Sequence, residues 1–149
     1  MSSRSGSYTG ARVISIILMV VGAVMIITGV TTYAMVSSTL AQEKITVSED
    51  ACLGGREIAG PLPAYCEAMI ISTHSMEATG GKTYAQLDRE DPLRQVAMNG
   101  SFLRASLFTS VVAFGVSLLV AGLGILFILV GAALLNLAGH REKAPPTTA

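Results

Sequence analysis

The side chains that could do chemistry lie mainly in one stretch of the chain, residues 72–94. This stretch places serines at 72 and 75 beside His74 and carboxylates at 88 and 91, the residue types of a Ser-His-acid hydrolase. Residues two apart on a helix point in different directions, however, and the G-x-S-x-G turn of many hydrolases is missing. A solvated helical face is therefore the favoured interpretation, and an envelope-lipid ester hydrolase is an alternative. Its candidate catalytic residues are Ser72, His74, Ser75, Asp88 and Asp91.

Other kinds of chemistry have less support. The stretch contains one histidine, no HExxH motif and no carboxylates at metal-ligand spacing, so we expect neither a metal nor a cofactor. The chain carries 10 Lys and Arg against 10 Asp and Glu without a basic block, so nucleic acid is not an expected partner.

Two long uncharged stretches, residues 13–42 and 105–139, flank the residues discussed above. Hydrophobic residues make up 51% of the 149 residues, and the mean hydropathy is +0.59. Because about 20 apolar residues cross a bilayer core, both stretches are predicted to span a membrane. The first stretch also resembles a secretory signal peptide, but its length favours a retained anchor. Neither stretch holds an Asp, Glu, Lys, Arg or His residue, which argues against a proton relay or an ion-coupled transporter.

The distribution of charge predicts the orientation. The tails, residues 1–12 and 140–149, hold four bases and one acid, whereas residues 43–104 hold six bases and nine acids. By the positive-inside rule, both tails are cytoplasmic and the central segment is extracytoplasmic in a multi-pass protein of the cytoplasmic membrane. The predicted fold class is an all-α membrane protein, a two-span helical hairpin with a small extracytoplasmic helical cap. We expect residues 140–149 to be disordered.

An extracytoplasmic central segment lies in an oxidising compartment. Cys52 and Cys66 are therefore predicted to form a disulfide, worth about 3 kcal/mol for a loop of about 15 residues. Two free thiols are the alternative.

Local signals predict the elements of the central segment. Residues 43–51 are predicted to form a frayed helix end or a short strand, and residues 53–63 are predicted to form a loop. Residues 64–79 read as an amphipathic helix. Its predicted face carries Tyr65, Met69, Ser72 and Met76. Thr83 and Gln86 fit a capping box, and Asp91 followed by Pro92 predicts the start of a helix that continues into the second span, with Gly100 as its weak point.

Small residues recur every seven positions in both spans, which predicts close helix packing in lipid. Their positions are Ser15, Gly22 and Gly29 in the first span, Ser110, Ser117, Gly124, Gly131 and Ala138 in the second, and Gly115 and Gly122 in a parallel series. We expect one hairpin to be unable to bury both stripes, which favours a homo-oligomer.

Both spans are longer than the bilayer requires. Counting about 20 residues from the cytoplasmic ends places the outer boundary near Tyr33 and Ser117. The overhangs beyond it are uncharged, and we expect neighbouring copies to cover them as a bundled neck; a strong tilt is the alternative.

Residues 77–116, EATGGKTYAQLDREDPLRQVAMNGSFLRASLFTSVVAFGV, resemble a group of short two-span membrane proteins of actinobacteria, including mycobacteria and streptomycetes. The similarity covers most of the chain, from Arg12 to Leu137. It implies that TGGKTYAQLDREDP is a signature element and that the cysteine pair is particular to some members. Members often carry the label aromatic ring-opening dioxygenase, but such enzymes bind iron through His and carboxylate ligands, and this chain has only His74 and His140. The resemblance therefore transfers no functional residue.

These observations predict a structural or interaction protein of the actinobacterial, mycobacterial-type cell envelope. Its expected partners are copies of itself and membrane lipids. An accessory subunit of a larger envelope or respiratory membrane complex is the first alternative, and the hydrolase is the second.

Overall fold

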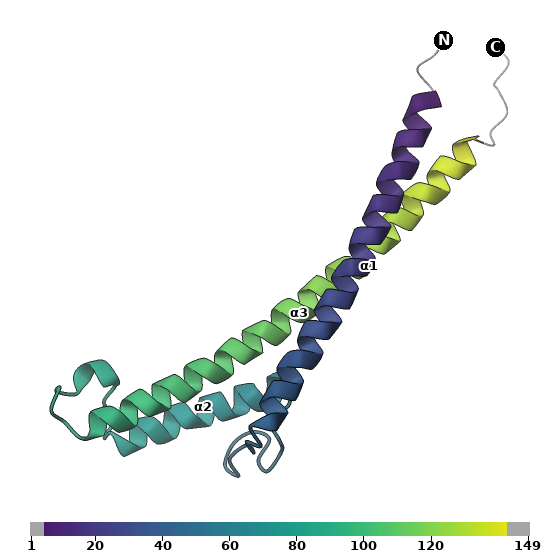
Figure 1. Ribbon diagram of the computed structural model, residues 1–149. Coiled ribbons are helices and arrows are strands. Elements are labelled where there is room, and N and C mark those ends of the chain that lie inside the picture. The colour runs from purple at the N-terminus through teal and green to yellow at the C-terminus, as the bar shows by residue number, and fades with distance from the viewer. Residues whose placement is uncertain (1–4, 143–149) are drawn as a thin grey trace. The chain divides into compact units, whose positions relative to one another are not determined.

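The computed structural model describes residues 5–142 and is 78% helical. The elements in chain order are α1 (Ser5–Gln42), α2 (Pro61–Ala78), the 3-10 turn η1 (Tyr84–Gln86) and α3 (Leu93–Glu142) (Figure 1). Among the described residues, β structure is limited to one isolated antiparallel bridge between Thr46 and Glu57. The all-helical class is confirmed, and the two long helices are compatible with a membrane hairpin.

Helical structure extends further toward both ends than the sequence indicated. Residues 5–12 and 140–142, predicted to belong to the tails, continue α1 and α3. The rest of the predicted tails, residues 1–4 and 143–149, lies outside the described residues.

The chain divides into two compact units. We name residues 1–31 with 117–149 the hairpin unit, and residues 32–116 the head unit. The divisions fall at Thr31/Thr32 and Val116/Ser117. Both lie within two residues of the extracytoplasmic boundary of the bilayer that was counted from the sequence.

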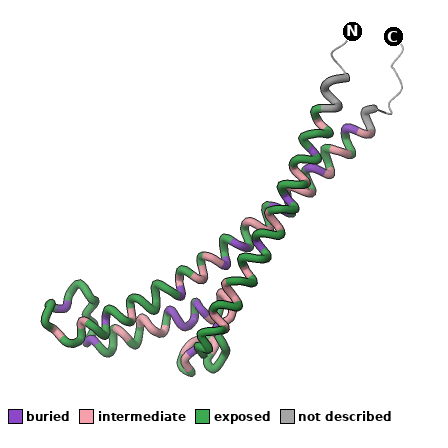
Figure 2. The backbone as a smooth tube through the Cα atoms, in the orientation of Figure 1, coloured by how far each residue is buried: buried purple, intermediate pink, exposed green. Residues whose placement is uncertain are grey.

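The hairpin unit is held by contacts between residues without large side chains. A Cβ atom on Gly22 would lie 2.5 Å from the carbonyl oxygen of Gly124, and a Cβ on Gly124 would lie 2.6 Å from that of Gly22. A Cβ on Gly29 would lie 2.6 Å from the carbonyl oxygen of Ser117. The backbones of α1 and α3 therefore touch at positions where any side chain would separate them. Buried residues spaced by seven mark this crossing in Figure 2: Ser15, Gly22 and Gly29 on α1, and Ser117, Gly124, Gly131 and Ala138 on α3.

The small-residue stripes thus pack on each other inside one chain. The premise that one hairpin cannot bury both is wrong, because each stripe covers the other. Ser110 is an exception to the predicted stripe: it lies in the head unit, where its hydroxyl donates to the carbonyl of Ser106 at 3.2 Å. The parallel series also differs, since a Cβ on Gly115 or Gly122 would meet nothing within 4 Å.

The remaining faces of the two long helices are apolar and exposed. The candidate spans lie within Gly10–Gln42 and Leu93–Gly139, and only 17% and 11% of their most apolar windows are buried. The core helix of a soluble protein would bury most of such a window. Large side chains such as those of Ile27 and Leu129 face outward instead, as they do in helices surrounded by lipid.

The head unit buries large side chains where the hairpin unit has glycines. The ring of Phe114 on α3 is fully buried and lies 4.8 Å, centroid to centroid, from the ring of Tyr33 on α1. Beyond this contact, Leu107 packs in one cluster with residues of α2 and of the loop between α1 and α2, residues 43–60: Val47, Ile58, Ala64, Cys66 and Ala68. The overhangs of the two long helices are therefore covered on one side by the chain itself. This differs from the expectation that neighbouring copies cover them.

The predicted disulfide joins the loop to α2. Cys52 and Cys66 are bonded, with their Cα atoms 5.5 Å apart. Two backbone hydrogen bonds close the loop on itself, from Val47 N to Arg56 O at 2.8 Å and from Ile58 N to Ile45 O at 2.9 Å. Residues 43–51, predicted as a frayed helix end or a short strand, form turns and a single bridge residue.

Helix α2 differs from its prediction in the face that it buries. It begins at Pro61, three residues earlier than expected, and buries Ala64, Cys66, Glu67 and Ala68. The predicted face is largely outward, with Tyr65 45%, Met69 44% and Met76 37% exposed. The disulfide fixes the rotation of the helix, and the two alanines let it approach the loop closely.

The capping signals are confirmed. The amide and hydroxyl of Thr83 both donate to Oε1 of Gln86, at 2.9 and 3.1 Å. The amide of Leu93 donates to Oδ1 of Asp91 at 2.9 Å, which caps the start of α3. The helix then continues without interruption through Gly100 into the second predicted span, residues 105–139.

Candidate functional site

His74 on α2 is hydrogen-bonded to an aspartate outside the set that the sequence suggested. Its Nε2–H donates to Oδ2 of Asp50 at 2.6 Å, and both side chains are about half exposed. This hydrogen bond lowers the pKa of Asp50 below its ordinary value of 3.8. The pair therefore ties α2 to the loop just before Cys52.

The other hydrolase candidates have separate positions. Asp91 caps α3, and the backbone carbonyl of Asp88 accepts a hydrogen bond from the amide of Asp91 at 3.1 Å. Ser72 and Ser75 line a cavity to which His74 does not contribute. Within residues 5–142, no hydrogen bond joins His74 to any of these four residues. The structure thus gives the hydrolase hypothesis no catalytic arrangement.

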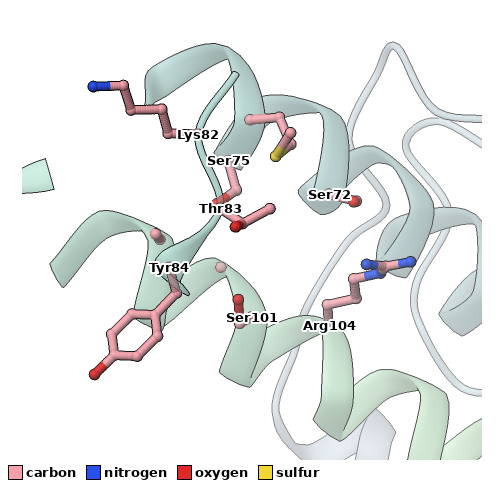
Figure 3. Close-up of a pocket in the computed structure, with 10 residues that line it drawn as sticks. Ser72, Ser75, Lys82, Thr83, Tyr84, Ser101 and Arg104 are labelled. Carbon is pink, nitrogen blue, oxygen red and sulfur yellow. The ribbon is translucent and has the colours of Figure 1, made fainter. Parts of the chain in front are cut away.

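The cavity beside Ser72 and Ser75 has a volume of about 100 Å³. It lies in the head unit, where the second half of α2, the segment after Gly81 and the first turns of α3 meet (Figure 3). The hydroxyls of Ser75, Thr83 and Ser101 face its centre from these three segments. Its remaining polar lining residues are Ser72, Lys82, Tyr84 and Arg104.

A close approach of two helices shapes this cavity. A Cβ on Gly100 of α3 would lie 2.5 Å from Oγ of Ser75 on α2. Gly100, which the sequence marked as a weak point, therefore provides the space that Ser75 occupies. A second contact orders the rim, where the guanidinium of Arg94 lies 4.0 Å from the ring centroid of Tyr84 and donates to the carbonyl of Leu87 at 2.6 Å.

A larger groove of about 590 Å³ lies elsewhere in the head unit, between the end of α1, α2 and α3. Its walls combine aliphatic residues such as Val36, Ile71 and Leu103 with the carboxylates of Glu43 and Glu67 and three hydroxyl side chains. The hydroxyl of Thr39 in its lining donates to its own helix, at Met35 O.

Glu67 is the one acidic side chain buried among the described residues. Its carboxylate accepts hydrogen bonds from the amide and the hydroxyl of Ser48, at 2.7 and 3.0 Å. Both oxygens are thus used to hold the loop against α2, which is a structural role.

The comparisons with known proteins add no identification. No protein family, curated protein or solved structure matches the chain. In the part of the chain that the structure describes, no three His, Cys, Asp or Glu side chains form a group that could hold a metal ion.

Sequence reasoning missed the partners in both polar sites. Asp50 is 24 residues from His74, and Ser101 and Arg104 are far from Ser75 in the chain. The disulfide was the available signal for the first pair, because Cys66 brings α2 back to the loop that contains Asp50. For the cavity, Gly100 within a predicted helix was the signal, since a helix-interior glycine often marks a close approach.

Proposed function

We propose that the protein is an integral protein of the cytoplasmic membrane with a structural or interaction role in the actinobacterial cell envelope. In this proposal the hairpin unit spans the bilayer and the head unit lies on the extracytoplasmic side. Copies of the chain associate through a face of α3 that the fold leaves uncovered.

One observation carries the proposal: an apolar stripe runs along α3 in the head unit. Met98, Phe102, Val112 and Val116 are 43%, 75%, 63% and 53% exposed. With Ala105 and Thr109, which are also exposed, they alternate at spacings of four and three residues. The hydroxyl of Thr109 donates to the carbonyl of Ala105 at 2.8 Å, so it adds no free donor to the stripe.

A spacing of four and three residues is that of a coiled-coil seam. Copies inserted in one membrane have the same orientation, so their α3 helices run parallel and present equivalent residues at the same height. The stripe is therefore complementary to itself. Exposed apolar surface of this kind is uncommon outside interfaces.

The native mass of the protein in a maltoside detergent tests the proposal. We expect a multiple of 15.5 kDa for the unaltered chain and a single copy for Phe102→Asp, because a carboxylate in a seam is costly to desolvate. Asn99→Asp is the matched control, since Asn99 is exposed on α3 about 100° from the stripe. A monomeric unaltered chain would contradict self-association. Co-purification of unrelated subunits would favour the accessory-subunit alternative.

A further inference from the structure

The cavity between α2 and α3 is rich in hydrogen-bond donors. Ser72, Ser75, Thr83 and Ser101 contribute four hydroxyls to its lining. Within residues 5–142, the hydroxyls of Ser72, Ser75 and Ser101 have no hydrogen-bond partner. Thr83 uses its hydroxyl hydrogen on Gln86. Three donors are thus free to turn toward a ligand.

The charge of the lining has one sign. Lys82 and Arg104 line the cavity, and no Asp or Glu does. Neither cation forms an ion pair with a described residue. In Figure 3 the two side chains lie on opposite sides of the cavity, and both charged ends point away from its centre. The guanidinium of Arg104 lies 5.4 Å from the ring centroid of Phe108, and both side chains have long flexible stems that can bring the charge to the cavity.

The geometry points to a binding site for one tetrahedral oxyanion of the phosphate class. A volume of about 100 Å³ holds a few water molecules or one such ion. Several hydroxyl donors with two flanking cations satisfy its oxygens through charge-assisted hydrogen bonds, in which Arg offers two parallel donors. The oxyanion is either free phosphate or the phosphate of a lipid head group. The site is independent of the α3 stripe, because the stripe residues Met98, Phe102 and Ala105 do not line it.

Calorimetric titration of the full chain in a maltoside detergent, which contains no phosphate, tests the site. Inorganic phosphate is the first probe and short-chain phosphatidic acid is the second. We expect at least one of them to bind, and Arg104→Gln or Lys82→Gln to weaken that binding about tenfold each. Ser101→Ala removes a donor without changing charge and is expected to weaken binding less. Unchanged thermal melting of each variant shows that it is folded.

Arg89→Gln is the matched control, because Arg89 is an exposed cation of the same unit outside the cavity. Binding of inorganic phosphate that Arg104→Gln weakens and Arg89→Gln does not would support a free ion. The same pattern with phosphatidic acid alone would support a lipid head group. No binding of either probe, or equal weakening by Arg89→Gln, would overturn the site.

Discussion

The hairpin unit and the head unit use the same two long helices but hold them together in different ways. In the hairpin unit, Gly22 and Gly124 allow backbone to meet backbone. In the head unit, the rings of Tyr33 and Phe114 meet, and a disulfide fixes a third helix against the pair. The change occurs within a few residues along each helix.

The difference is the one expected if, as proposed, the hairpin unit lies in lipid and the head unit in water. In lipid, apolar side chains gain nothing by leaving their surroundings, so helices associate through close backbone packing at small residues. In water, burying apolar area is worth roughly 25 cal/mol per Å². The burial of large side chains such as Phe114 and Leu107 therefore offsets the conformational entropy that they lose on folding. Each unit therefore depends on a kind of contact that would be of little use in the other.

The largest effect is expected at the glycine contact. Gly124→Leu would place a side chain against the backbone of Gly22, which cannot move aside as a side chain can. We expect a loss of about 3 kcal/mol or more in the free energy of unfolding of the hairpin unit. Unfolding followed by circular dichroism in mixed micelles of increasing sodium dodecyl sulfate measures it.

Gly122→Leu is the matched control, because a Cβ at Gly122 meets nothing within 4 Å. Replacing a helix-interior glycine at an open position is expected to stabilise the helix by about 0.5–1 kcal/mol. Similar losses for both variants would contradict the intramolecular crossing.

The second prediction tests whether the head unit can be destabilised without affecting the hairpin unit. The double variant Cys52→Ala/Cys66→Ala removes the disulfide and is expected to destabilise the head unit by about 3 kcal/mol in the chain-entropy model. Amide hydrogen exchange measures it segment by segment. Protection should fall in α2 and stay unchanged in residues 15–31 and 117–138. A uniform loss of protection would mean that the two units unfold together.

The sequence predicts much of the fold because its strongest signals are local. Uninterrupted apolar stretches and the Asp91-Pro92 cap identify α1 and α3, and the seven-residue spacing identifies the faces that pack. A spacing does not specify the partner of a face, however. The stripes that contain Gly22 and Gly124 fit another copy as well as each other, and this is why the premise for the oligomer was wrong.

The polar sites were harder to predict, because they depend on contacts between distant segments. The rotation of α2 is set by Cys66 and by the hydrogen bonds of Glu67 to Ser48, and not by the face on which its larger apolar residues lie. With that rotation unknown, neither the pairing of His74 with Asp50 nor the cavity at Ser75 can be derived from periodicity.

The smallest effect is expected in the pH dependence of the head unit. The hydrogen bond from His74 lowers the pKa of Asp50 in the folded chain below the ordinary 3.8. The carboxylate is therefore favoured by folding, so the contribution is fully present above pH 3.8 and is lost as the pH falls through the lower folded value. Because both side chains are exposed, the change in stability is small.

Urea denaturation between pH 2.5 and 5 should show a decline in the free energy of unfolding as the pH falls. Asp50→Asn is expected to reduce this decline, whereas the control Glu77→Gln, an exposed change on α2, is not. A decline of the same size in Asp50→Asn would mean that this pair does not link α2 to the loop in solution.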